Sequence, residues 1–150
     1  MKREFPDHPL VGVGGVVIYR HRVLLVRRGA EPLKGQWSLP GGMLELGEEL
    51  EEGVRRELKE ETGLDVKPLA MLTVFDRIVR GGLRGRRVRY HYVIVDYVCR
   101  RKGGRLAPDS DVVDACWARR DDLPRYQLTD KATSVILQAF DYFEKRRRGA

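Results

Sequence analysis

The sequence predicts a single α/β domain whose mixed sheet is covered by helices. Two observations support this fold class: apolar runs typical of strands alternate with segments of helical periodicity, and no repeat or linker divides the chain. The 150 residues, 42% of them hydrophobic, are enough to build one buried core. We expect one domain over residues 1–150, with its folded core at about 10–143 and a basic C-terminal tail at 144–150.

The first predicted elements are two strands and a loop. Residues 11–19 (VGVGGVVIY) are rich in β-branched side chains, and residues 23–28 (VLLVRR) form a second apolar run after the polar RHR. A short turn should therefore join two neighbouring strands. Residues 29–37 have the composition of a loop, and LPGG at 39–42 is typical of a turn.

A helix is predicted over residues 48–62. Leu50, Val54 and Leu58 recur at intervals of four and form one apolar stripe. Gly63 follows directly, and glycine commonly ends a helix because it adopts the left-handed conformation without strain. The helical pattern therefore has both a packing face and an end.

The second half of the chain returns to strands and closes with a helix. We expect a strand at 64–76, a mobile Arg/Gly-rich loop at 77–89, a strand at 88–100, a turn at 101–105, a short strand at 114–118 and an amphipathic helix at 128–148. Either Thr129 or Asp130 is suited to be the N-cap of this last helix, because both side chains can accept a hydrogen bond from its first turn.

The chain is basic, and its positive charge is unevenly distributed. Twenty-nine Lys and Arg residues against 22 Asp and Glu residues give a formal charge of +7, with clusters at 77–89 and 144–150. Such clusters favour anionic partners: phosphorylated small molecules, nucleic acid or acidic surfaces. No apolar run reaches the roughly 18–20 residues that span a membrane, so we expect no membrane partner. The two cysteines, Cys99 and Cys116, lack metal-type spacing, and we expect a cytoplasmic, reducing environment without a secretory signal.

Acidic side chains gather on one face of the 48–62 helix. At 100° per residue, Glu60 and Glu61 lie about 60° and 40° to either side of Glu57, next to the apolar stripe. Like charges so close together repel, and partial burial adds a desolvation cost. A divalent cation such as Mg²⁺ or Mn²⁺ would resolve this conflict, because it prefers carboxylate oxygens. A solvated, charge-rich surface helix is the alternative interpretation of the same spacing.

The order of the residues around this helix is more specific than their charge. From Gly42 to Leu64 the chain reads G-x5-E-x7-R-E-L-x-E-E-x-G-L, preceded by WSLPGG at 37–42. This pattern resembles the Nudix box at every fixed position, and the similarity extends over about residues 10–143. The resemblance implies a Nudix fold, an α/β/α sandwich with a mixed central sheet. It also implies hydrolysis of a pyrophosphate bond with Mg²⁺ or Mn²⁺ as cofactor.

The resemblance assigns roles to residues of the box. It implies that Glu57 and Glu61 are the principal metal ligands and that Glu60 is a ligand or the group that activates water; Glu57 or a loop acid could also be the base. Further residues implied are the Gly41 carbonyl as a ligand, Gly42 as a point of close backbone approach, and Glu48 with Arg56 as a supporting pair.

One metal ligand in this family often lies outside the box. Asp111 is the leading candidate here, and Asp109 and Asp114 are alternatives; each could equally be a loop acid that binds no metal. Arg27 and Arg28 could reach substrate phosphates, although they could also be surface charges.

The substrate is less well defined by sequence than the chemistry. The resemblance favours a nucleoside diphosphate linked to another group, with ADP-ribose-like compounds first. A MutT-type (deoxy)nucleoside triphosphate pyrophosphohydrolase and a nucleotide- or RNA-binding module are the alternatives, the last because the 77–89 segment is rich in Arg and Gly. That segment could be a substrate lid, a solvent-exposed loop or part of a homodimer interface. Aromatic residues are expected in the core or an interface more than in base stacking: Phe75, Tyr90, Tyr92 and Trp117.

Overall fold

The computed structural model describes residues 2–31 and 33–149. The elements in chain order are β1 (Leu10–Tyr19), β2 (Arg22–Arg28), β3 (Trp37–Ser38), β4 (Gly41–Met43), α1 (Leu50–Thr62), β5 (Leu64–Gly81), η1 (Leu83–Gly85), β6 (Arg87–Gly104), β7 (Val112–Arg119), η2 (Arg120–Tyr126) and α2 (Asp130–Gly149). No helix in these two ranges is long and apolar enough to cross a membrane.

The strands of the described residues form one mixed sheet in the order β3-β2-β1-β6-β5, with β4 paired to β1 and β7 paired to β2. Strands β1 and β6 run parallel, from Leu10 opposite Tyr92 to Val17 opposite Cys99, and the other pairs are antiparallel. This arrangement confirms the predicted α/β class and mixed sheet.

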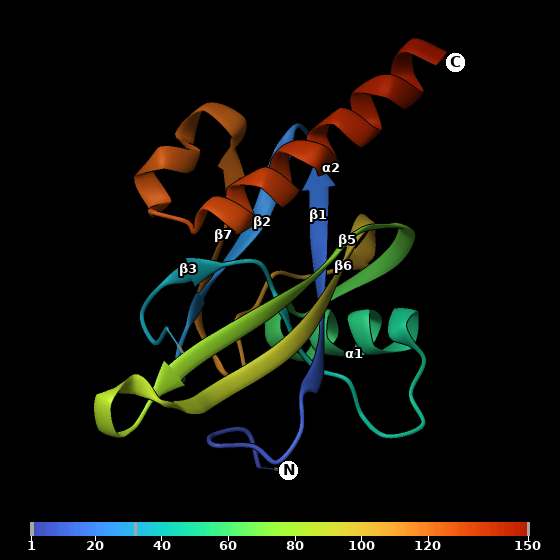
Figure 1. Ribbon diagram of the computed structural model, residues 1–150. Helices are drawn as coiled ribbons and strands as arrows, with labels where there is room; N and C mark the ends of the chain where they lie inside the picture. Colours follow the sequence, from blue (N-terminus) through green and yellow to red (C-terminus); the bar gives the residue numbers. More distant parts are fainter. Residues whose placement is uncertain (1, 32, 150) are drawn as a thin grey trace.

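The two helices cover opposite faces of the sheet (Figure 1). On one face, Val54 and Leu58 of α1 pack with Val13, Val17 and Val95, and all five are buried. On the other face, α2 packs over the alternate residues of the same strands, with Val16, Val98 and Ile136 among the buried members. Side chains of neighbouring strand residues point to opposite faces, so β1 and β6 contribute to both cores. The result is the predicted α/β/α sandwich.

The helix ends follow the sequence signals. Gly63 has φ 78°, and its N–H donates to the Lys59 carbonyl to close the last turn of α1. A side chain at Gly63 would also meet the Arg105 carbonyl. At the start of α2, the Thr129 hydroxyl accepts a hydrogen bond from the Ala132 N–H at 3.1 Å, so Thr129 rather than Asp130 is the N-cap.

The prediction of a mobile loop at 77–89 is wrong for most of this segment, which is β-strand. Residues 77–81 extend β5 and residues 87–89 begin β6, and the hairpin turn occupies only 82–86. The reason is a continued period-2 pattern: Arg77 and Val79 lie opposite Tyr92 and Tyr90 on one face. In Figure 1 this hairpin projects away from both helices.

Other boundaries also differ from the predictions. The expected turn at 101–105 is still strand as far as Gly104, because it pairs with Leu64 at the start of β5. The described part of the basic tail predicted at 144–150 is helical and belongs to α2, in agreement with the helix predicted over 128–148, since Lys and Arg are good helix formers and are favourable near a helix C-terminus. Residue 150 lies outside the described residues. Short strands β3 and β4 occur where a loop and a turn were expected, because they pair with β2 and β1.

Candidate active site

Strand β4 brings two glycines against two glutamates of α1. The Gly41 N–H donates a hydrogen bond of 2.8 Å to Oε1 of Glu61. A Cβ atom at Gly42 would overlap the carboxyl group of Glu57, and one at Gly41 would overlap the backbone of Val13 in β1. Only glycine lets the strand approach the helix and β1 so closely.

Glu61 is the most strongly perturbed acid at this position. Glu61 is 6% exposed, and burial raises the pKa of its carboxyl group to about 8. The Gly41 N–H and the charge of Arg28 oppose this rise in pKa, whereas Glu57 and Asp111 add to it. Glu61 therefore lies in a buried, acidic setting in which a nearby cation would stabilise its charged form.

Glu57 lies one turn earlier and has a similar environment. Burial raises the pKa of Glu57, and Glu60 adds to the rise. A hydrogen bond and the positive charge of Arg56 act in the opposite direction, as does the charge of Arg3. Glu57 and Glu61 are thus two adjacent carboxylates whose negative charge is only partly balanced by the chain.

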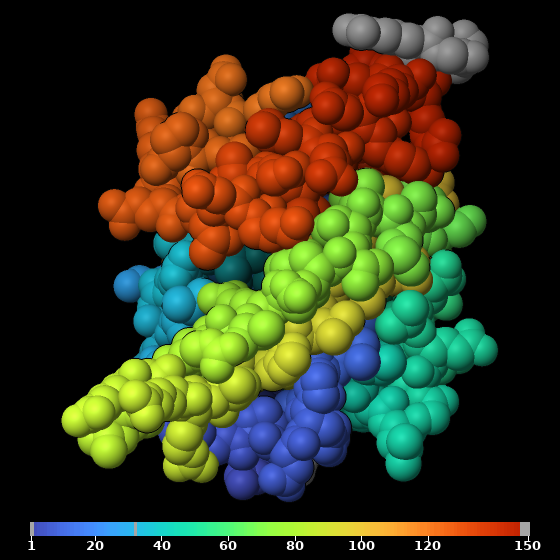
Figure 2. Space-filling view, viewed as in Figure 1, coloured from blue at the N-terminus to red at the C-terminus, as the bar shows by residue number. Residues whose placement is uncertain are grey.

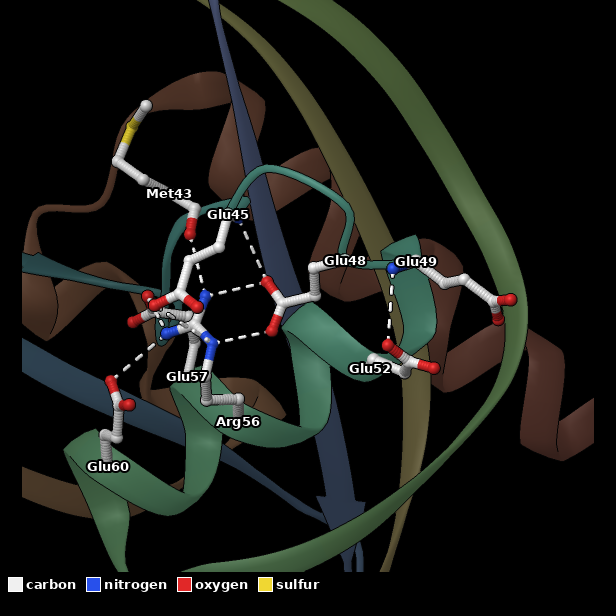
Figure 3. Close-up of polar contacts among 8 residues, drawn as sticks. All are labelled: Met43, Glu45, Glu48, Glu49, Glu52, Arg56, Glu57 and Glu60. Atoms are coloured by element: carbon white, nitrogen blue, oxygen red, sulfur yellow. Dashed lines mark hydrogen bonds and ion pairs between the residues drawn. The ribbon is translucent and has the colours of Figure 1, made fainter. Parts of the chain in front are cut away.

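Arg56 is the centre of the polar contacts at this end of α1 (Figure 3). Its Nε and Nη2 atoms donate to the two carboxylate oxygens of Glu48 at 2.7 and 2.9 Å, and Nη2 also donates to the Met43 carbonyl at 2.8 Å. Its Nη1 donates to Glu57 at 2.8 Å and to Glu60 at 3.2 Å. The hydrogen bonds between Glu48 and Arg56 lower the pKa of Glu48 and raise the pKa of Arg56. Arg56 therefore ties the 43–49 loop to the helix and orients two carboxylates.

The loop before β7 supplies the third side of the site. The charge of Asp111 acts on Glu61, and its backbone carbonyl accepts a hydrogen bond from Gly29 at 2.7 Å. Asp109 contacts Glu61 through its backbone N–H, which donates to the Glu61 carbonyl at 3.0 Å. Asp114 pairs in register with Arg27 within the sheet. Of the three candidate loop acids, the structure thus brings the charge of Asp111 to Glu61.

The donor atoms at this position suit a hard divalent cation. Glu57, Glu60 and Glu61 offer carboxylate oxygens, and the buried pair Glu57 and Glu61 carries unbalanced negative charge. In the described part of the chain, no three acidic, His or Cys side chains are already close enough to hold a metal ion. Glu57 and Glu60 both accept hydrogen bonds from Arg56, which would compete with a cation for their oxygens.

The two arginines singled out in the sequence lie in different settings. Arg28 acts electrostatically on Glu61, whereas Arg27 is exposed and donates to the Gly35 carbonyl at 3.0 Å. The structure adds Arg77, which is half-buried opposite Tyr92; burial and the neighbouring Arg28 lower its pKa. Arg77 was missed as an individual residue because its segment was interpreted as a loop. The alternation of 77–81 was the signal that could have placed it on the inner face.

The α/β/α sandwich, with an acidic helix packed against a glycine strand, defines the structural class of this protein. Residues 8–139 match the family model described as the NUDIX domain, and the chain belongs to this family. The resemblance seen in the 42–64 segment is thereby confirmed.

Curated relatives carry several descriptions. An "ADP-ribose pyrophosphatase" from Methanocaldococcus jannaschii is 36% identical over 121 residues, covering 79% of this chain and 66% of that protein. The human "8-oxo-dGDP phosphatase NUDT18" is 32% identical over 129 residues, covering 83% of this chain and 36% of that protein. The chain therefore spans less than two thirds of the length of either relative.

Solved structures share the fold closely. A MutT NUDIX hydrolase from Burkholderia pseudomallei has a TM-score of 0.74 and 30% identity, and the match covers 88% of this chain and 98% of that one. The NUDIX domain of Shewanella oneidensis NrtR, complexed with ADP ribose, has a TM-score of 0.71 and 26% identity, covering 92% and 90% of the two chains.

Proposed function

We propose that this protein hydrolyses the pyrophosphate bond of a nucleoside diphosphate linked to another group, with ADP-ribose-like compounds as the first candidates. The observation that carries the proposal is the juxtaposition of Glu57 and Glu61 with the glycine strand, facing the positive charge of Arg28. The M. jannaschii relative supports the substrate class through its description.

A divalent Mg²⁺ or Mn²⁺ ion would supply charge neutralisation of the pyrophosphate and a more acidic bound water. Glu57 and Glu61 would hold it, with Glu60, Asp111 and the Gly41 carbonyl as further oxygen donors. Glu60 is 48% exposed, so it can meet solvent and accept the proton of the attacking water; Glu57 is the alternative base. Glu48 and Arg56 hold the loop and helix in place.

The positive side of the site would bind the phosphates. Besides burial, the charge of Arg28 lowers the pKa of Arg77, so the two guanidinium groups are near each other. The charges of both arginines also oppose the rise in the pKa of Tyr92 that burial causes. Two guanidinium groups that repel each other gain from an anion placed between them. Arg27 has a smaller part in this proposal, because it is exposed and is not among the charges that act on Glu61.

A (deoxy)nucleoside triphosphate, oxidised ones included, is the second candidate substrate. The human relative and the B. pseudomallei structure favour it through their descriptions. RNA is a weaker candidate partner, suggested only by the exposed arginines at the tip of the β5–β6 hairpin. Homodimer formation also stays a prediction.

The test is hydrolysis of a substrate panel with Mg²⁺ and, separately, Mn²⁺. The panel contains ADP-ribose, other nucleotide sugars, canonical and 8-oxo nucleoside triphosphates, and capped RNA. We expect one dominant substrate, and we expect Glu57→Gln/Glu61→Gln to lower its turnover more than about 100-fold, beyond the usual effect of a supporting residue. Glu51→Gln, an exposed position on the same helix, is the matched control. Absence of turnover with either metal, or full activity in the double variant, would refute the proposal.

A further inference from the structure

A buried acid on β6 has no part in the site described so far. Asp96 is 4% exposed, and its carboxylate lies against Gly14 of β1, where a Cβ atom would overlap Oδ1 of Asp96. No residue in the described ranges donates a hydrogen bond to this carboxylate. A buried carboxylate without a donor is costly, so its position calls for a ligand or another source of compensation.

The Asp96 carboxylate is nevertheless not fully enclosed by protein atoms. Among the described residues, no side-chain oxygen or nitrogen is both fully enclosed and without a hydrogen-bond partner. The Asp96 oxygens, which have no such partner, must therefore border space large enough for a water molecule. Burial raises the pKa of Asp96 to about 6, and Lys131 of α2 opposes this rise. Asp96 is thus largely ionised at neutral pH and ready to accept a hydrogen bond.

A hollow lies between α2, β5 and the segment around β3 (Figure 2). The charge of Lys131, in the first turn of α2, acts on Asp96, and the Lys131 Nζ atom lies 4.7 Å from the ring centre of Phe75 on β5. Phe75 pairs with Ile94, two residues before Asp96 on β6. The Pro40 carbonyl is 3.3 Å from the position that a Gly14 Cβ would take beside Asp96. An acceptor, a donor and an aromatic ring therefore lie near one another on the side of the sheet that α2 covers.

Asp96 also lies near the active site, by way of Pro40. Pro40 is followed by Gly41, whose N–H binds Glu61. A ligand with its phosphates near Glu61 and Arg28 could thus extend past Pro40 to Asp96. Phosphate itself would be repelled by a carboxylate, whereas a flat base suits an aromatic ring and nearby apolar side chains such as Leu39 and Leu72.

We propose that Asp96 selects the nucleobase of the substrate by accepting a hydrogen bond from an N–H group on the base edge. Lys131 donates to a neighbouring acceptor atom, and Phe75 contacts the face of the base. Adenine fits this arrangement, because its amino group stands beside a ring nitrogen that accepts; guanine offers N–H groups beside its carbonyl. The inference rests on the proposed function, since it concerns the nucleoside part of the same substrate.

The test measures binding rather than turnover. The full chain is titrated by calorimetry with AMP, with GMP, and with purine riboside 5′-monophosphate, which has no N–H group on its six-membered ring. We expect AMP or GMP to bind about 10-fold or more tightly than purine riboside monophosphate, as for one hydrogen bond to a charged acceptor. Asp96→Ala should bring this ratio close to one, and Asp96→Asn should lower it. Asp76→Ala, at an exposed acid on β5, is the matched control and should keep the ratio.

Two results would overturn the inference. One is a wild-type protein that binds the three nucleotides equally. The other is a folded Asp96 variant, Ala or Asn, that binds all three more weakly by the same factor, because this indicates a structural role alone. Binding that discriminates through Asp96 without hydrolysis of any panel substrate would support this inference and refute the proposed function. Hydrolysis with no dependence of base preference on Asp96 would do the reverse.

Discussion

At the scale of single residues, Gly42 sets the position of the Glu57 carboxylate. An alanine there would overlap this group, which also accepts a hydrogen bond from Arg56. We expect Gly42→Ala to lower turnover about 100-fold, since small displacements of a reacting group are costly, and to destabilise the fold by about 1–3 kcal/mol. Gly103→Ala is the control, because a Cβ atom there meets nothing within 4 Å. Equal effects of the two variants on turnover would contradict the assignment.

Asp96 gives a second prediction at this scale, in the pH dependence of stability. Its pKa is about 6 in the folded chain against an ordinary value of 3.8, because burial disfavours the charged form. As pH rises from 4 to 6 the unfolded chain loses this proton first, so ionisation of Asp96 lowers stability in that window, and the effect levels off above the folded pKa. The stability of Asp96→Asn minus that of the wild type should increase by about 2 kcal/mol between pH 4 and 6. Urea unfolding at each pH measures this difference, and a constant difference would show that Asp96 is not perturbed.

At the scale of elements, Arg56 joins the 43–49 loop to α1. Arg56→Met leaves Glu48 without its two guanidinium hydrogen bonds and frees the Met43 carbonyl. Because this ion pair is mostly shielded from solvent, we expect a loss of about 2–4 kcal/mol in the free energy of unfolding, measured in urea. Arg55→Met changes an exposed arginine on the same helix and should cost less than about 0.5 kcal/mol. Similar losses in both variants would mean that the loop is held by other contacts.

The sequence predicted the elements that depend on local pattern. It did not predict the elements whose structure depends on pairing with a distant strand. The helix at 48–62 and its end at Gly63 follow from periodicity and from the left-handed preference of glycine. The 77–89 segment looked like a loop because of its glycines and charges, yet pairing with β6 makes most of it strand. For the same reason the sequence did not indicate Arg77 as a site residue, because Arg77 becomes half-buried only through that pairing. Likewise, the proximity of Asp96 to Lys131 depends on how α2 packs on the sheet, which no local pattern contains.

At the scale of the whole molecule, a basic protein carries an acidic centre. The formal charge is +7, although the acids Glu57 and Glu61 mark the proposed reaction site. A cation bound there would reverse the local sign, and the surrounding positive charge would then attract an anionic substrate from a distance. The arrangement thus separates two electrostatic tasks: carboxylates act over a few ångströms, and the net charge acts over the screening length.

This separation predicts a salt effect on capture and not on chemistry. With saturating Mg²⁺ or Mn²⁺, kcat/KM for the preferred nucleotide should fall about 2- to 10-fold between 50 and 300 mM KCl, because salt screens long-range attraction. The kcat value should change little, since the bound substrate is held by short contacts. Arg84→Gln/Arg86→Gln at the exposed hairpin tip should weaken the salt dependence, whereas Lys59→Gln, on the exposed side of α1, should change it less. If kcat fell with salt as much as kcat/KM does, the positive charge would be acting on the bound state, and the proposed division between capture and chemistry would be wrong.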